Sequence, residues 1–329
     1  LGWADRLSVV RIGPAIGSAQ RHGRGKTTSR AASPDETVEN WLIRNGQTAR
    51  LREMLWEPLA LAAMNQPANE AGAAAFVRVL ADAFGSHAGD SAIALPRVPL
   101  AQLWADPSRR FVEARGGTVV TNALARVTVD GGRISGIVTR GGERLQAGAV
   151  ISTVPWHAVA TLFERVPAPL QDLVTNARRM RSYPIVTVNL WFDRPVLDVP
   201  FVGLPGREMQ WVFDKRAVFD GAATHLSLVS SGASRLVPMT NEQVVAVAMH
   251  ELQAVVPDVT RATLRHAGVV RERHSTFSVA PGEPPRPACP TALPGFYLAG
   301  DWTDTALPGT IESAAMSGHT AARELEARG

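Results

Sequence analysis

The sequence predicts a mixed α/β protein with a helical first part, two regions of short strands and a helix near its C-terminus. Three observations predict this class. Apolar residues recur at helical spacing up to about residue 110. Short strand-like segments bounded by turn residues follow. A buried strand then leads through a Gly-Asp turn into the last helix. With 329 residues, of which 45% are hydrophobic, the chain is long enough for about two domains with a sizeable core.

The helical part contains three predicted helices. The first follows Ser33-Pro34-Asp35-Glu36, which has the pattern of a capping box with proline at the first helical position, and Gly46 is its stop signal. The second covers 51–64, and the third begins at Asn69 and carries an apolar stripe to Phe84. The helices over 51–84 are interpreted as buried against the substrate domain. The low charge between Pro58 and Asn69 supports the alternative, an apolar entrance that faces a membrane.

Short strands begin near residue 117. Three of them are separated by glycine-containing turns and form a predicted β-meander, at 118–121, 125–129 and 133–139. The apolar run 149–154 has the composition of a strand buried on both faces. Further strands are predicted at 185–192, 210–213 and 225–229, and a helix with the capping pair Thr240 and Gln243 at 240–256.

The segment from Phe296 to Glu326 carries the most informative pattern. Its strand delivers Gly300 at the carboxyl end, where ligands bind in open α/β sheets, and glycine allows a close approach to the backbone. Asp301 offers a carboxylate suited to a ribityl or ribose hydroxyl. Pro308-Gly309-Thr310 opens a helix, from about Gly309 to Leu325, whose N-terminus stabilises negative charge such as the N1–C2=O edge of a reduced flavin. The plain alternative is a strand, a glycine turn and a helix without a ligand.

This segment resembles the C-terminal FAD signature of the amine oxidase and carotenoid desaturase superfamily. Two segments narrow the resemblance to the squalene-associated FAD-dependent desaturases, also called hydroxysqualene dehydroxylases. Trp56-Glu57-Pro58-Leu59 is similar to their W-x-P-L, and Gln210-Trp211-Val212-Phe213-Asp214-Lys215 is similar to Q-W-x-F-D-R. Residues 272–277 resemble E-K-R-A-T-F with three changes.

The resemblance implies FAD as cofactor and an amine-oxidase-like fold of two domains. The flavin domain would take a β-meander with a return strand (109–160) and the C-terminal segment (286–329). The substrate domain would take the helical part (1–108) and a mixed-sheet part (161–285). The cofactor-binding positions that the resemblance implies are Val127, through its backbone, and Gly300, Asp301, Trp302, Pro308, Gly309, Thr310, Ile311 and Glu312. The side chain of Val127 is expected in the core.

Two departures from the family pattern affect the cofactor. No G-x-G-x-x-G is present, although relatives bind the pyrophosphate with that motif. We therefore expect a flavin domain that is incomplete at its N-terminus, and weak or no FAD binding by this chain alone. In addition, Ser313 stands where the family has glycine after the glutamate.

By resemblance, the function is that of an FAD-dependent oxidoreductase of squalene and hopanoid biosynthesis, which reduces hydroxysqualene to squalene by flavin hydride transfer. The implied partner is a long apolar isoprenoid substrate. Trp211 and Phe213 form either a wall for that substrate or one side of the core, and His274 is a candidate to approach the substrate. His157 is interpreted as a surface loop residue or as lining the flavin side. No residue is identified as the general acid, so no catalytic residue is named.

Two other functions stay open. A carotenoid-type desaturase or an amine oxidase belongs to the same superfamily, but two tyrosines and two lysines fit poorly with the aromatic cage and lysine of an amine oxidase. The alternative from another class is a non-catalytic, truncated remnant that binds apolar ligands or a partner chain.

Composition excludes several further classes. The net charge of +4 is spread along the chain, and the densest basic stretch, 21–30, lacks interleaved aromatic residues, so nucleic acid is not an expected partner. One cysteine, Cys289, and the absence of H-x-x-x-H and H-E-x-x-H patterns argue against a metal site. No apolar run is long enough to span a membrane, and the first residues lack a signal-peptide pattern. We expect a cytoplasmic protein, with peripheral contact to the inner face of the membrane left open.

Overall fold

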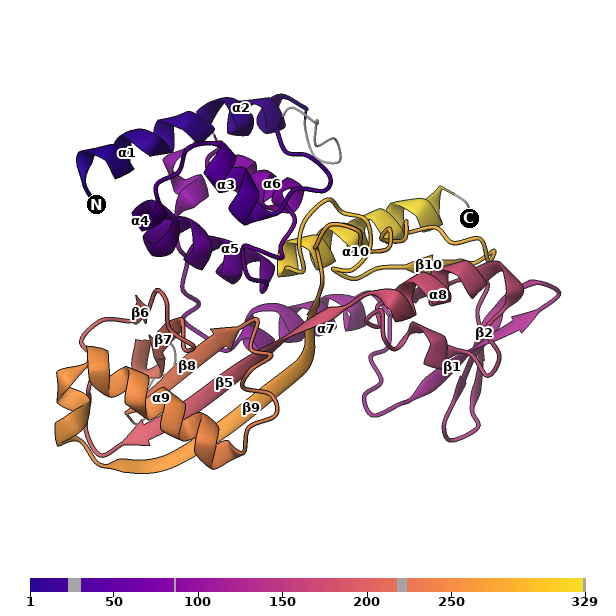
Figure 1. The fold of residues 1–329 in the computed structure, drawn as a ribbon. Helices are drawn as coiled ribbons and strands as arrows, with labels where there is room; N and C mark the ends of the chain where they lie inside the picture. Colours follow the sequence, from indigo (N-terminus) through magenta and orange to yellow (C-terminus); the bar gives the residue numbers. More distant parts are fainter. Residues whose placement is uncertain (23–30, 86, 218–223, 328–329) are drawn as a thin grey trace.

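The computed structural model describes residues 1–22, 31–85, 87–217 and 224–327, so most of the basic stretch 21–30 lies outside the described residues. Figure 1 shows three regions: a group of N-terminal helices, a sheet covered by α9, and a region that combines β1 and β2 with the C-terminal β10 and α10. The prediction of a mixed α/β fold is confirmed, because helices and three separate sheets are present.

The N-terminal helices share one apolar core. Trp41, Trp56 and Phe76 are almost fully buried in it, and Trp41 and Phe76 pack edge to face. One face of the helices over 51–84 is therefore buried in this helical core, whereas Met54, Leu55 and Phe84 are 39%, 40% and 44% exposed. The helices of this region are α1 (Trp3–Val9), η1 (Val10–Ile12), α2 (Gly13–His22), α3 (Val38–Arg44), α4 (Ala49–Leu51), η2 (Arg52–Trp56), α5 (Glu57–Met64) and α6 (Ala73–Ala83).

Two predicted helix starts are wrong, because the residues at each predicted start form turns and the helix begins a few residues later. Glu36 does reach back to the backbone N–H of Ser33, but this contact closes a turn, and the helix begins at Val38 with Thr37 as its N-cap. The third helix begins at Ala73 and not at Asn69, because the preceding residues form turns. The stop at Gly46 is confirmed, since its φ of +66° is a left-handed conformation that favours glycine.

The β-meander contains β1 (Ala125–Asp130), β2 (Arg133–Thr139) and β3 (Arg144–Gln146) in sequential antiparallel order. The predicted strand at 118–121 is wrong, because that segment is irregular and mostly exposed. β4 (Val150–Ser152) instead pairs in parallel with β10 (Phe296–Leu298). Ile151 is 39% exposed, so the prediction that this strand is buried on both faces is also wrong for the described residues.

The larger sheet has the order β6-β7-β8-β5-β9 and is antiparallel throughout. Val186, Val188 and Leu190 point from β5 to the face covered by α9 and are fully buried there. The elements are β5 (Ser182–Phe192), β6 (Phe201–Gly203), β7 (Trp211–Asp214), η7 (Lys215–Ala217), β8 (His225–Ser231), α9 (Asn241–Val255), η8 (Pro257–Arg261) and β9 (Leu264–Phe277). The capping pair Thr240 and Gln243 of α9 is confirmed.

Two connecting segments complete the fold. The first carries η3 (Ala88–Ser91), η4 (Ala101–Ala105) and α7 (Asp106–Glu113), and it exposes Trp104 and Phe111 by more than half of their surface. The second carries η5 (Val159–Leu162), η6 (Ala168–Leu170) and α8 (Gln171–Arg179). Across the described residues, no helix is both long enough and apolar enough to cross a membrane.

Candidate functional site

The loop between β10 and α10 (Ile311–Glu326) places the residues that the sequence singled out. Gly300 follows the buried strand β10 with a φ of +130°, which L-residues with side chains rarely adopt. A side chain at this position would also place its Cβ atom 3.0 Å from the Cδ1 atom of Trp302. The predicted strand with a glycine turn at its carboxyl end is therefore present, and the backbone itself requires the glycine.

Asp301 and Gly309 meet across this loop. A Cβ atom at position 309 would lie 3.1 Å from Asp301 Oδ2 and 3.2 Å from the Cγ2 methyl group of Thr276. Burial raises the pKa of the Asp301 carboxyl, while backbone N–H groups and the charge of Arg286 oppose that increase. A half-buried carboxylate beside a glycine is suited to accept a hydrogen bond from a ligand hydroxyl.

The start of α10 is fixed against the same loop by hydroxyl groups. Thr310 is the N-cap and its Oγ1 accepts a hydrogen bond from the backbone N–H of Ser313 at 3.1 Å. Ser313 is fully buried and donates to the carbonyl oxygen of Asp301 at 3.0 Å, so its side chain does not occupy the outer face of the helix. Ile311 and Glu312 lie exposed on the first turn, at the positive end of the helix dipole.

Arg286 is a partly buried residue of this site, and the sequence resemblance gave it no role in holding the cofactor. It donates to the carbonyl oxygen of Leu307 at 2.6 Å and to that of Asp301 at 3.4 Å, and its guanidinium lies over the ring of Phe277 at 5.1 Å. Burial lowers its pKa, and the nearby carboxylates of Asp304 and Asp301 oppose this. The signal in the sequence was that Arg286-Pro287 and Thr291 precede the flavin segment as they do in the family that the chain resembles.

Two predicted cofactor positions have buried side chains. Trp302 is completely buried, and its Nε1 donates to the carbonyl oxygen of Val154 at 3.0 Å, which ties the loop to the chain after β4. Pro308 is buried as well. For these two residues only the backbone is left to face a ligand.

Val127 lies on β1 at a second location. Its side chain is 8% exposed and packs in a core with Ile134 and Phe163, which confirms the expectation for the side chain. The same residue lines a cavity of about 770 Å³ under the meander. The structure therefore leaves room beside this strand for a ligand.

Trp211 and Phe213 lie on the sheet face opposite α9. Burial alternates along β7: Val212 and Asp214 are buried, whereas Trp211 and Phe213 are half-buried. The ring of Phe201 lies 6.1 Å from that of Trp211 and 6.0 Å from that of Phe213. The two aromatic residues are thus outside the core of the sheet and form a continuous aromatic surface.

His274 and His157 come together although the sequence considered them separately. Their ring centroids are 4.7 Å apart, and His274 Nδ1 shares a hydrogen bond with Ser182 Oγ at 2.8 Å. Burial, and secondarily the charge of His274, lower the pKa of His157. His157 lies exposed in the loop after β4, and its neighbour Trp156 packs on Phe277, the last residue of β9.

These features fit a flavin. Gly300 allows the tight turn after β10, Asp301 offers an acceptor for a ribityl hydroxyl, and the start of α10 offers positive partial charge. In the described part of the chain, no three His, Cys, Asp or Glu side chains cluster in a way that would hold a metal ion.

Comparison with known proteins identifies the class. The family model described as flavin containing amine oxidoreductase matches residues 9–325. The chain therefore belongs to this family, as the strand, glycine turn and helix indicated.

Curated relatives narrow the similarity further. The chain is 32% identical over 298 residues to hydroxysqualene dehydroxylase of Sinorhizobium fredii, which covers 88% of this chain and 66% of that protein. It is 31% identical to the enzyme of the same name from Rhodopseudomonas palustris, covering 85% and 63%. It is also 25% identical to 15-cis-phytoene desaturase of Synechococcus elongatus, covering 68% and 50%. The chain thus spans about two thirds or less of the length of these relatives.

Solved structures support the fold. An oxidoreductase from Methanosarcina mazei is similar with a TM-score of 0.71 at 14% identity, covering 98% of this chain and 73% of that one. Wild-type putrescine oxidase bound to putrescine is similar with a TM-score of 0.70 at 15% identity, covering 99% and 76%. The predicted amine-oxidase-like fold is confirmed.

Proposed function

We propose that the chain forms part of an FAD-dependent oxidoreductase of squalene and hopanoid biosynthesis, which reduces hydroxysqualene to squalene. The observation that carries the proposal is the junction of Asp301, Gly309 and the start of α10, which is suited to a flavin. The similarity to two hydroxysqualene dehydroxylases over 85% or more of the chain supports the substrate.

In this proposal, each part of the site has one task. Gly300 and Asp301 hold the ribityl chain, the first turn of α10 stabilises negative charge at the N1–C2=O edge, and the backbone of Val127 holds the adenine. Trp302 and Pro308 contribute through their backbone only. When bound, reduced FAD supplies hydride.

The substrate would lie along the sheet face that carries Trp211 and Phe213. The reaction breaks an allylic C–O bond, whose oxygen leaves as water after it gains a proton, and forms a C–H bond with hydride. The protein orients the chain and excludes water from the reacting carbon. His274 lies near the end of β9 and packs on His157 of the loop after β4, which supports its place near the substrate.

We also propose a cytoplasmic protein with peripheral contact to the inner face of the membrane, where an apolar isoprenoid accumulates. The exposed Trp104 and Phe111 of the segment η4–α7 support a contact with lipid. The same exposed residues support the alternative of a remnant that binds apolar ligands or a partner chain.

A carotenoid-type desaturase is the second candidate, because the similarity to 15-cis-phytoene desaturase covers 68% of the chain. Amine oxidation has less support, since the solved amine oxidases are similar at 14–15% identity, which concerns the fold alone.

Flavin binding tests the cofactor part of the proposal. The purified chain is mixed with FAD, passed over a desalting column and examined for flavin bands near roughly 370 and 450 nm. Because the chain has no G-x-G-x-x-G, we expect weak retention of flavin, and at least tenfold weaker retention still in Gly309→Ala, whose new methyl group would crowd Asp301 and Thr276. Gly318→Ala is the matched control on the same helix, because no atom lies within 4 Å of its new methyl group.

Turnover tests the substrate part. Under reducing, anaerobic conditions the flavin-loaded protein should convert hydroxysqualene to squalene, measured by gas chromatography. Conversion of phytoene without conversion of hydroxysqualene would replace the first candidate by the second. A folded chain that retains no flavin would support the non-catalytic alternative.

A further inference from the structure

The inner face of α10 carries two buried serines, Ser313 and Ser317, which are 0% and 2% exposed. Residues four positions apart in a helix lie on the same face, one turn apart. Serine is mostly found at protein surfaces, and a buried hydroxyl is costly unless it forms hydrogen bonds. The partners of these two hydroxyls therefore show what the serines do.

Both hydroxyls bind the backbone of the loop between β10 and α10. Ser317 Oγ accepts a hydrogen bond from the N–H of Gly300 at 2.7 Å. Ser313 Oγ donates to the carbonyl oxygen of Asp301 at 3.0 Å and, because its one proton is used there, accepts from Thr305 Oγ1 at 2.5 Å. The two serines thus hold the loop at three successive places along the chain.

The two peptide groups that flank the Cα atom of Asp301 are both fixed by hydroxyl groups. On one side, Thr303 Oγ1 donates to the carbonyl oxygen of Gly300 at 2.9 Å, and on the other side Ser313 holds the carbonyl oxygen of Asp301 itself. Fixed flanking peptides set the direction of the Cα–Cβ bond. The carboxylate, which lies beside Gly309, is therefore directed by the backbone and not by a bound ligand.

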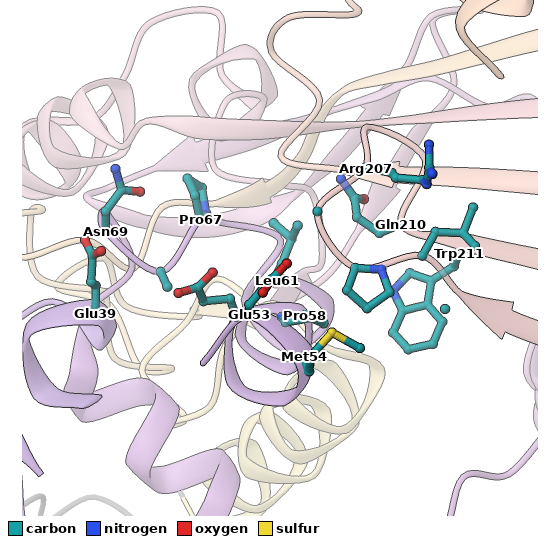
Figure 2. Close-up of a pocket in the computed structure, with 16 residues that line it drawn as sticks. Glu39, Glu53, Met54, Pro58, Leu61, Pro67, Asn69, Arg207, Gln210 and Trp211 are labelled. Atoms are coloured by element: carbon teal, nitrogen blue, oxygen red, sulfur yellow. The ribbon is translucent and has the colours of Figure 1, made fainter. Parts of the chain in front are cut away.

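The carboxylates of another cavity are not held in this way. Figure 2 shows Glu39 and Glu53 in a cavity of about 530 Å³ that Trp211 bounds on the opposite side. Glu39 lies 3.8 Å from Arg52 and Glu53 lies 3.1 Å from Arg50, and both carboxylates are 43% or more exposed. Exposed ion pairs contribute little and leave the side chains mobile. A preorganised acceptor is found at Asp301 and not in this cavity.

Ser313 is also the residue at which the chain departs from the family pattern, which has glycine there. A side chain at this position has two possible effects, since it either obstructs a ligand at the helix start or supports the loop. The hydroxyl is fully buried and binds Asp301 and Thr305, so the contacts favour support.

We propose that Ser313 and Ser317 are positioning residues, whose hydroxyls hold the loop between β10 and α10 in its ligand-binding form before a ligand arrives. Through this loop they direct the carboxylate of Asp301. The identity of the ligand as a flavin rests on the proposed function, whereas the hold on the loop follows from the hydrogen bonds. A loop that is already ordered loses less conformational entropy on binding, so affinity is higher.

Amide hydrogen exchange of the flavin-free chain, followed by mass spectrometry, tests the hold on the loop. Ser317→Ala leaves the N–H of Gly300 without its partner, and Ser313→Gly removes both hydrogen bonds of that hydroxyl. Each substitution should speed exchange within 300–307 at least about tenfold, while peptides from β5 and α9 stay unchanged. Unchanged exchange of the loop in both variants would refute the positioning role.

Thr320→Ala is the matched control for this experiment. Its hydroxyl donates to a carbonyl oxygen of α10 itself at 3.0 Å and not to the loop. Exchange within 300–307 should therefore stay within about twofold of the wild type. An equal acceleration in this variant would show that any loss of a hydroxyl on α10 loosens the loop, which contradicts a specific role of the two serines.

Flavin affinity tests the effect on Asp301. In a fluorescence titration with FAD, Ser313→Ala should weaken binding about fivefold in the wild-type background. In the Asp301→Asn background it should weaken binding less than about twofold, because the serine acts through the carboxylate. Equal effects in the two backgrounds would contradict this route. Tighter binding by Ser313→Gly than by the wild type would show that the serine obstructs the ligand, which overturns the proposal.

The two measurements separate the positioning role from the proposed function. A wild-type chain that binds no FAD, with exchange accelerated as expected in the serine variants, refutes the cofactor part of the proposed function and supports the hold on the loop. A chain that binds FAD, with exchange of the loop unchanged in the serine variants, refutes the positioning role alone.

Discussion

Replacing Asn65 with alanine should destabilise the protein more than any other single change of a polar residue that we propose. Asn65 ends α5 with a φ of +52° and is 4% exposed. Its Nδ2 donates to the carbonyl oxygen of Tyr183 and to Thr276 Oγ1, both at 3.0 Å, and its Oδ1 accepts from the N–H of Gly232 at 2.7 Å. One side chain therefore joins the helices to three parts of the sheet region.

The magnitude follows from these contacts. Each hydrogen bond contributes about 1 kcal/mol net, so the loss of three costs about 3 kcal/mol. Alanine in a left-handed conformation costs about 1 kcal/mol more. We expect a decrease of about 4 kcal/mol in the free energy of unfolding for Asn65→Ala. Asn65→Gly removes the hydrogen bonds but tolerates the backbone, so it should lose about 3 kcal/mol.

Urea unfolding followed by circular dichroism measures these values by linear extrapolation. Asn40→Ala is the control, because Asn40 is exposed on α3 and its change should stay within about 0.5 kcal/mol. If both variants of Asn65 lose less than about 1 kcal/mol, comparable to the control, the side chain does not hold the helices on the sheet and the reasoning is refuted.

Three further predictions concern buried or paired groups. Arg286→Met keeps the apolar stem but removes the hydrogen bonds to two carbonyl oxygens, so it should lower the free energy of unfolding by about 2 kcal/mol in the same assay; no loss would show that the guanidinium is dispensable. Burial and a hydrogen bond to Glu70 raise the pKa of Tyr183 to about 12. The stabilisation from its neutral phenol is thus present below pH about 10 and lost as the pH rises through about 12. An absorbance titration at 295 nm should show the ionisation of this phenol as a step near pH about 12 that is absent from Tyr183→Phe. His274→Asn should raise the pKa of His157 but leave it below the ordinary value, because burial is the larger cause of its decrease; an unchanged proton NMR titration of His157 would show that the two rings do not interact.

Local patterns predicted the elements whose stabilising contacts are local. The capping pair of α9, the stop at Gly46 and the two hairpin strands within 125–139 all depend on hydrogen bonds or turns between residues a few positions apart. The capping box at Ser33 was misread because a local hydrogen bond can also close a turn before the helix begins.

The long strand β9 was not predicted at all. Leu264–Phe277 contains several charged residues and no regular alternation, and one of its faces is largely exposed. It is a strand because it pairs with β5 over almost its whole length. Such pairing joins segments far apart in the chain, so tertiary context overrides the local preference.

The sequence by itself determined the family and the order of strand, glycine turn and helix that is suited to a flavin, because those features are carried by residues within one short segment. Only the tertiary structure decided which distant side chains meet. It brought Asn65 to Thr276 across 211 residues and placed Arg286 against the loop between β10 and α10. It also made Glu57 and Trp211 walls of one cavity. Contacts of this kind depend on how whole elements pack, and a hydrophobic pattern specifies which face is buried without specifying against what.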